Sequence, residues 1–284
     1  MSSLYLCLEL YKGNNKMFCD IPVDENEKKQ KMKAVFNDII KRYVEDLGDK
    51  LSDKKLDNDN FWETYIITTI DFLVTIENFD YLFTTIKGLF KKFKLNNAFL
   101  KCLEPFILKN KIKFISNEPF REIVTYYREK DKLKVLQHLI INLDINSMDT
   151  GFIISLCLEH NLFAALIYIC NRSDDDFITP LVKMFAVFRG KFETNDPMAQ
   201  ESGYKCLWYI KMTLNGIMFP EEKMTEERYK VVLRQMICWI FVEENLKALI
   251  EIDPEIMFKI LYILFQGQAL EVLEEYDEDM VKKK

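Results

Sequence analysis

Glycine and proline are scarce in this sequence, whose 284 residues include 8 glycines and 7 prolines. Average usage would give roughly 20 glycines and 14 prolines. β-Propellers, sandwiches and barrels turn about every 8–12 residues and use these two residues for the turns. The shortage therefore argues against β-rich folds and against collagen-like or low-complexity chains. It also disfavours a phosphate-binding loop, and neither a GxGxxG nor a GxxxxGK[ST] motif is present.

Cysteine and histidine do not occur in metal-binding spacings. No two of the seven cysteines form a CxxC pair, and most lie in apolar stretches with helical periodicity. This pattern is typical of buried, reduced thiols in a cytosolic protein. With His138 and His160 as the only histidines, we expect no metal centre and no cofactor. The cysteines are Cys7, Cys19, Cys102, Cys157, Cys170, Cys206 and Cys238.

Apolar residues are plentiful, at 49% of the chain, but they never form a run long enough to span a bilayer. The 22 Phe, 13 Tyr and 3 Trp supply enough apolar area for a folded core. The longest apolar candidate, VVLRQMICWIFVEEN, is interrupted by Arg234 and Gln235. The first residues do not resemble a secretory signal. We expect a soluble, cytoplasmic protein whose membrane association is peripheral and occurs through partners.

The apolar residues recur with helical spacing along most of the chain, which predicts an all-α fold of about a dozen helices. They fall at i, i+3, i+4 and i+7, with charged residues on the opposite face. Sustained alternation with a period of two, which would indicate strands, is absent from the sequence. Examples of the helical stripes are Phe36/Ile39/Ile40/Tyr43/Leu47, Phe120/Ile123/Val124/Tyr127, Leu133/Leu136/Ile140/Leu143 and Met257/Ile260/Leu261/Leu264.

Capping residues mark the expected helix starts. Asp253-Pro254-Glu255 places a capping residue, a first-turn proline and a first-turn acid in the preferred order. Asn117-Glu118-Pro119 predicts the same for the helix that carries Phe120. Asp149 and Thr225 are expected to open two further helices.

The organisation predicted from these stripes is an α-solenoid of stacked helical hairpins, similar to clathrin or tetratricopeptide arrays. Residues 131–143 are expected to pair with 149–159, and 161–171 with 177–189, giving hairpins of about 30 residues. Residues 1–94 form a predicted N-terminal helical segment with charged loops at 20–33 and 48–60. Residues 95–284 form the predicted central solenoid, with a polar linker near 190–203. The alternative architecture is a compact helical bundle.

Few side-chain groupings suggest chemistry, and each has a structural explanation. Cys157 and His160 share a helical face, but the apolar stretch IISLCLEH indicates a core thiol. The acids at 173–176 (SDDD) lack the ligand pattern of a calcium loop and are expected to cap a helix. We therefore predict no catalytic residue and assign no binding residue from sequence.

Three surface features are candidates for contacts with other molecules. The basic stretch at 87–94 (KGLFKKFK) suits a solvated helix end or, alternatively, a site for an acidic partner or membrane. The overall net charge of −6 gives no reason to expect nucleic-acid binding. The aromatics Tyr204, Trp208 and Tyr209 are interpreted as core, although such residues also concentrate at interfaces. A GTPase-activating role would need an exposed arginine, for which Arg121, Arg128, Arg189 and Arg234 are candidates by residue type.

Several segments in the middle of the chain resemble the vacuolar protein sorting subunit eight family, the CORVET-specific endosomal tethering subunits. The resemblance covers roughly residues 95–265 and concerns the family's central helical region only. It is carried by LDINSMD (143–149), LCLEHNLFAALIYICN (156–171), DDFITPL (175–181), GYKCLWYIKMTLNGIMFP (203–220) and LIEIDPEIMFKIL (249–261).

The resemblance implies a scaffold or docking segment of a CORVET-type tethering complex on early endosomes, acting in vesicle tethering and vacuolar or lysosomal transport. The implied partners are other class C tethering subunits and an endosomal Rab GTPase. Family members resemble a propeller, a solenoid and a RING-type zinc domain in series, and this chain matches only the solenoid. The alternatives are a helical regulator of an endosomal Rab GTPase and a HOPS-type or clathrin-like coat or adaptor subunit.

Overall fold

The computed structural model describes residues 59–173, 175–191 and 196–266, together with scattered helical positions between 36 and 48. The predicted charged loop at 20–33, most of the one at 48–60 and the acidic C-terminal segment lie outside these residues. The chain divides into two compact units, Met1–Ser147 and Met148–Lys284. The predicted boundary between residues 94 and 95 stays a prediction.

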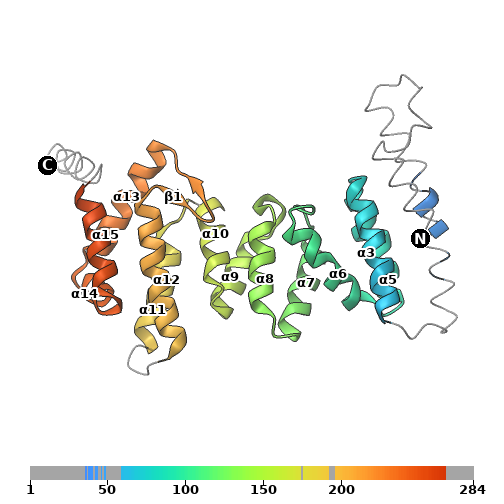
Figure 1. Cartoon of the computed structure of the whole chain (residues 1–284), viewed down its shortest axis with the longest axis horizontal. Coiled ribbons are helices and arrows are strands. Elements are labelled where there is room, and N and C mark those ends of the chain that lie inside the picture. The colour runs from blue at the N-terminus through green and yellow to red at the C-terminus, as the bar shows by residue number, and fades with distance from the viewer. Residues whose placement is uncertain are drawn as a thin grey trace, which may run out of the picture. The chain divides into compact units, whose positions relative to one another are not determined.

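The first unit is a series of helices that run up and down in alternation (Figure 1). Its central helix α6 packs against α3, α5, α7 and α8. A short π-helical turn, Leu82–Ile86, joins α4 to α5, and a 3₁₀ turn, Ile145–Ser147, follows α8. The helices are α3 (Asp59–Thr75), α4 (Phe79–Tyr81), α5 (Lys87–Lys92), α6 (Asn96–Leu108), α7 (Asn117–Glu129) and α8 (Leu133–Asn142).

The second unit stacks its helices in the same alternating manner and adds one small hairpin. Strands β1 (Ile217–Met218) and β2 (Glu222–Lys223) pair antiparallel, with Ile217 opposite Lys223. This hairpin was not predicted, because two-residue strands leave no alternating pattern to detect. The helices are α9 (Thr150–His160), α10 (Phe163–Ser173), α11 (Ile178–Lys191), α12 (Pro197–Leu214), α13 (Glu226–Ile240), α14 (Glu243–Ile252) and α15 (Pro254–Gln266).

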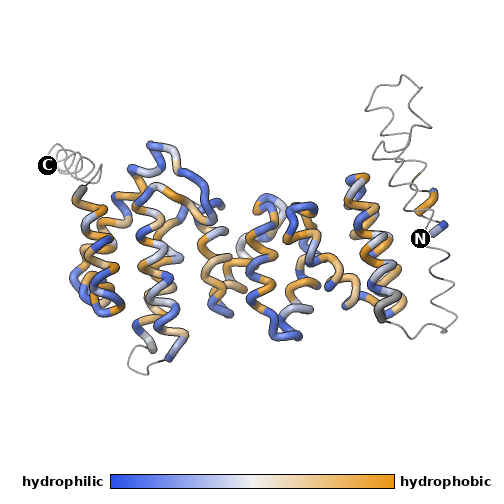
Figure 2. The backbone as a smooth tube through the Cα atoms, in the orientation of Figure 1, coloured by the Kyte–Doolittle hydropathy of each residue, from blue (hydrophilic) through white to orange (hydrophobic). Residues whose placement is uncertain are grey.

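The predicted all-α fold of tetratricopeptide-like stacked helices is confirmed. Figure 2 shows that hydrophobic and hydrophilic residues are both distributed along the helices of the two units. The stripe of α7 is buried as predicted, at Phe120, Ile123, Val124 and Tyr127. These residues pack the inner faces of the helices, where burial of apolar area stabilises the stack.

The hairpins are grouped differently from the prediction. Within the second unit α9 packs most closely against α10, and α11 against α12. Helices α8 and α9, which the sequence had paired, fall in different units. Periodicity locates helices well but carries no signal for which neighbour a helix faces.

Of the polar linker expected near 190–203, the residues that the structure describes are mostly helical. Asp196 caps α12, since its side chain accepts a hydrogen bond of 2.9 Å from the backbone of Met198. Residues 197–203 form the first two turns of this helix. Ser202 and Gly203 are buried there, so these polar and small residues mark a close helix contact and not a loop.

The predicted helix starts are confirmed at three of the four positions. Asp149, Thr225 and Asp253 each accept a hydrogen bond from a backbone N–H in the first turn, at 3.1, 3.4 and 3.0 Å. Helix α7 departs from the prediction by one residue, because Ser116 and not Asn117 is its N-cap.

The shortage of glycine is visible in the turns. Among the described residues, six that are not glycine adopt the left-handed conformation that glycine usually occupies, and each lies one or two residues past the end of a helix. Asn161 is the example at the predicted junction of α9 and α10, with φ of 55°. The others are Glu77, Lys94, Asn110, Asp131 and Asp175.

Candidate protein-docking surface

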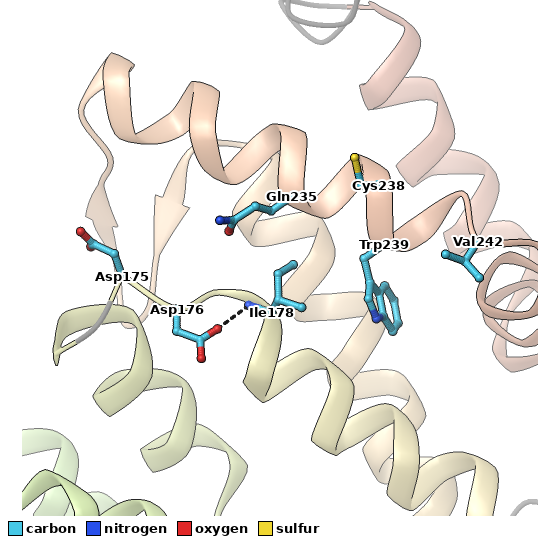
Figure 3. Close-up of a pocket in the computed structure, with 7 residues that line it drawn as sticks. All are labelled: Asp175, Asp176, Ile178, Gln235, Cys238, Trp239 and Val242. Carbon is cyan, nitrogen blue, oxygen red and sulfur yellow. Dashed lines mark hydrogen bonds between the residues drawn. The ribbon is translucent and has the colours of Figure 1, made fainter. Parts of the chain in front are cut away.

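A surface groove of about 600 Å³ lies in the second unit between the start of α11 and the C-terminal half of α13. Figure 3 shows its lining side chains, with the two aspartates at one end and Val242 at the other. The lining residues are Asp175, Asp176, Ile178, Gln235, Cys238, Trp239 and Val242.

The apolar part of the groove is held by an aromatic pair. The ring of Trp239, from α13, meets the ring of Phe185, from α11, edge to face with centroids 5.0 Å apart. The guanidinium of Arg189 lies over the same Phe185 ring, 5.8 Å from its centroid. Edge-to-face contacts of this kind fix ring orientation and add to the stabilisation from burial.

The acidic end of the groove is built by the link between α10 and α11. One side-chain oxygen of Asp176 accepts hydrogen bonds from the backbone N–H groups of Ile178 and Thr179, at 3.0 and 2.9 Å. Asp176 therefore caps α11, as the sequence predicted for this acidic run. Asp175 forms an ion pair with Arg228 of α13.

Arg228 also ties the first turn of α13 to the end of α10. Its guanidinium donates a hydrogen bond of 2.6 Å to the backbone carbonyl of Asn171 and lies 5.5 Å from the centroid of the Phe177 ring. Arg228 thereby joins α13 to α10 and to the link before α11 at the acidic end of the groove.

Cys238 is the exposed cysteine among those that the described residues contain. The other four, Cys102, Cys157, Cys170 and Cys206, are buried. Burial and the nearby Cys170 raise the pKa of the Cys157 thiol to about 12. Because the thiolate is the nucleophile, this confirms the interpretation of Cys157 as a core thiol. His160 points to Glu159, with Nε2 3.5 Å from its carboxylate.

The three aromatics singled out on α12 do not share one role. Tyr209 is buried, as predicted, and its hydroxyl lies within 3.1 Å of the Phe177 carbonyl oxygen. Tyr204 and Trp208 are about half exposed, which corrects the prediction that they belong to the core. Trp208 packs against Phe219 of the β-hairpin, with ring centroids 5.8 Å apart.

The basic stretch at 87–94 is only partly a solvated helix end. Lys87 is buried and its ammonium lies 3.2 Å from Glu122 of α7. Lys91 reaches the same carboxylate oxygen at 3.0 Å. Two of the lysines thus join α5 to α7 inside the first unit, an arrangement that charge patterning alone could not distinguish from a binding patch.

The four candidate arginines are distributed over three helices. Arg121 and Arg128 lie exposed on α7, Arg189 at the end of α11 and Arg234 on α13. Arg189 pairs with Glu244 at 3.4 Å. None of the four lines the groove or the smaller cavity of about 380 Å³ beside Phe79 and Phe114 in the first unit.

Sequence reasoning did not find the groove. Its apolar residues on α13 have the spacing of an ordinary core stripe. The sequence alone does not show which apolar stripe stays exposed to solvent. Among the described residues no cluster of metal-binding side chains occurs, and within the same part of the chain no helix is long and apolar enough to cross a bilayer.

Stacked helices that alternate in direction make the described part of the chain a tetratricopeptide-like repeat structure. A family model described as "Vps8 central TPR" matches residues 98–277. The chain therefore belongs to the Vps8 central TPR family, as the motifs had indicated.

Individual relatives agree with this assignment. The chain is 24% identical to the vacuolar protein sorting-associated protein 8 homolog of Mus musculus over 256 residues, which is 87% of this chain and 18% of that protein. The Homo sapiens homolog is 25% identical over 243 residues, 82% of this chain and 17% of that protein.

The yeast relative matches a smaller part of this chain. Vacuolar protein sorting-associated protein 8 of Saccharomyces cerevisiae is 27% identical over 164 residues, 56% of this chain and 13% of that protein. The chain therefore spans less than a fifth of the length of these curated relatives. No solved structure matches the chain.

Proposed function

We propose that this chain is a scaffold and docking segment of a CORVET-type tethering complex. In this role it acts in endosomal vesicle tethering and in protein transport to the vacuole or lysosome. It binds other class C tethering subunits and reaches the early endosome through them. It performs no catalysis of its own.

The observation that carries the proposal is the family match over residues 98–277, which includes both helices that border the groove. The relatives are named for vacuolar protein sorting. A segment of such a protein that is made of packed helices suits a scaffold, because helices that each contact their neighbours present an extended surface to partners. The second unit adds a preformed apolar groove, and such surfaces are typical of protein contacts.

The mechanism follows from rigidity and exposure. The Trp239–Phe185 contact and the Arg228 interactions hold the groove in shape before a partner arrives. A groove that keeps its shape loses less conformational entropy when it binds, so more of the contact energy becomes affinity. Specificity comes from the pattern of apolar and charged groups on its walls.

Purified class C tethering subunits test the proposal in a pull-down with the full chain. We expect at least one subunit to be retained, and retention to fall when Val242 is replaced by Asn. The control is Phe258→Asn, which removes an exposed apolar side chain that lies outside the groove. Retention of no subunit by the wild-type chain would contradict a docking role.

A GTP-hydrolysis assay with an early-endosomal Rab protein tests the competing regulator role. The full chain is expected to leave the hydrolysis rate unchanged. An acceleration lost on replacement of one of the candidate arginines would replace the scaffold proposal with a catalytic one.

A further inference from the structure

The solvent side of α13 carries an uncharged stripe. Val231, Gln235 and Cys238 follow one another at i, i+4 and i+7, and Val242 continues the line past the end of the helix. All four are exposed, Val231 by 56% and Val242 by 49%. No member of this stripe is charged, although 30% of the residues in the chain are.

Helix α11 supplies the opposite wall of the groove. Ile178 lines it, and Val182, one turn further along, is 40% exposed. Phe185 continues the same face and holds Trp239 at the floor. From Gln235 to Val242, which both line the groove, the wall extends about 10 Å, so the groove matches about two turns of a helix.

Carboxylates gather at one end of this apolar strip. Asp175 and Asp176 come from the link before α11, and Glu227 lies in the first turn of α13, one turn before Val231. Arg228 offsets one of these charges. At the other end Arg189 and Glu244 pair with each other, 3.4 Å apart, so the acidic end keeps the excess charge.

From this pattern we propose that the groove binds an amphipathic helix of a partner protein, with its apolar stripe on Trp239 and Val242 and a lysine or arginine over Asp175, Asp176 and Glu227. An apolar stripe laid in a groove is a common mode of helix recognition. The charges at one end select the basic partner and set its direction. This inference rests on the proposed docking function and names the chemistry of the segment that docks.

A three-turn synthetic helical peptide serves as the probe, with leucines at i, i+4 and i+7 and lysines at one end. Fluorescence anisotropy of the labelled peptide measures its affinity for the full chain. We expect binding that weakens about tenfold when glutamates replace the lysines, and that disappears when serines replace the leucines. Equal affinity for the lysine and glutamate peptides would overturn the proposal.

Two variants of the chain place the peptide. Val242→Asn removes an apolar contact at the N-cap of α14, where Asn is well tolerated, so the fold is retained. It is expected to weaken binding about fivefold. Glu227→Lys, at an exposed position, is expected to do the same through charge. The control Phe258→Asn should leave the affinity unchanged; equal losses in all three variants would show nonspecific adhesion and overturn the groove.

Alkylation of Cys238 provides an independent readout of location. A bound peptide should slow its modification by iodoacetamide, measured by mass spectrometry of the peptide that contains it. Protection of Cys238 from alkylation at high chain concentration, without any peptide, would mean that a second copy of the chain occupies the groove. That result would overturn the proposal that the occupant is a helical segment of a partner.

The peptide experiment and the pull-down can fail independently of each other, so they distinguish the proposed groove from the proposed function. If the chain does not bind the peptide but retains tethering subunits, the groove is excluded as the docking site. The docking function would then use another surface. If the groove binds the peptide but the chain retains no subunit, the groove is supported as a helix-binding site and the proposed function is contradicted. If both succeed, the peptide is expected to displace the subunit, and failure to compete would overturn the groove as the docking site.

Discussion

The hydroxyl group of Tyr209 donates a hydrogen bond to the side-chain oxygen of Asn171, 2.9 Å away in the interior of the second unit. Tyr209 lies on α12 and Asn171 on α10, and both are buried. The bond therefore links two helices on either side of α11, whose start carries the acidic end of the groove.

Replacement of Tyr209 by Phe should lower the free energy of unfolding by about 1–2 kcal/mol, because the oxygen of Asn171 loses its partner in a buried place. Urea unfolding followed by circular dichroism measures the loss. The matched control is Tyr204→Phe on the exposed side of the same helix, expected to stay within about 0.5 kcal/mol of the wild type. Equal effects in the two variants would show that the buried hydrogen bond contributes nothing.

Gly203 is the close-contact residue of α12. A Cβ atom there would lie 3.0 Å from Cδ2 of Phe188 and 3.2 Å from Cγ1 of Ile252. Gly203→Ala is expected to destabilise the fold by about 1–3 kcal/mol, since the neighbouring side chains must shift. Gly190→Ala, where nothing lies within 4 Å, should instead stabilise by about 0.5–1 kcal/mol. Thermal unfolding of both variants measures the two changes in stability. A Gly203→Ala variant more stable than the wild type would contradict the close packing at this position.

Lys94 occupies a left-handed turn with φ of 62° after α5. This conformation costs a non-glycine residue about 1 kcal/mol, so Lys94→Gly should raise the free energy of unfolding by a similar amount. Lys92→Gly, in the last turn of α5, should lower it by about 1 kcal/mol because glycine is a poor helix former. Chemical denaturation of the pair measures both, and two changes of the same sign would be inconsistent with the turn.

Glu122 predicts a pH dependence of stability in the first unit. Burial alone raises the pKa of this carboxyl group, but hydrogen bonds from Lys91 and Lys87 outweigh it and hold the pKa below its ordinary value. A group whose pKa is lowered by folding stabilises the fold above its unfolded pKa of about 4.3. That stabilisation disappears as the pH falls through the folded pKa.

Glu122→Gln should therefore lower the free energy of unfolding at pH 7 by about 1–3 kcal/mol, since it leaves the buried ammonium of Lys87 without its charged partner. The difference from the wild type should shrink below a pH of about 4. Urea titrations from pH 7 downward measure it. A difference that stays constant over the whole range would contradict the ion pair.

The sequence predicted the helices well because their information is local. The stripe from Phe120 to Tyr127 is buried as expected, and Asp149, Thr225 and Asp253 cap the helices that they precede. Capping and periodicity depend on residues within one or two turns. The family assignment followed from short motifs in the same helices.

What the sequence did not reveal depends on contacts between distant residues. The sequence predicts that Gly203 is a linker residue, whereas in the structure Phe188 and Ile252 lie beside it. Lys87 reads as a solvated charge until Glu122, on another helix, is found 3.2 Å away. The groove depends on the exposure of Val242, and the residue type alone does not show whether an apolar side chain is exposed.

The measurement that tests the central claim most directly is the equilibrium affinity of the full chain for purified class C tethering subunits, with wild type and Val242→Asn compared side by side. The account predicts saturable binding of at least one subunit by the wild-type chain. It also predicts an affinity about fivefold weaker for the variant, as expected for the loss of one buried apolar contact. A wild-type chain that binds none of the subunits would contradict the account.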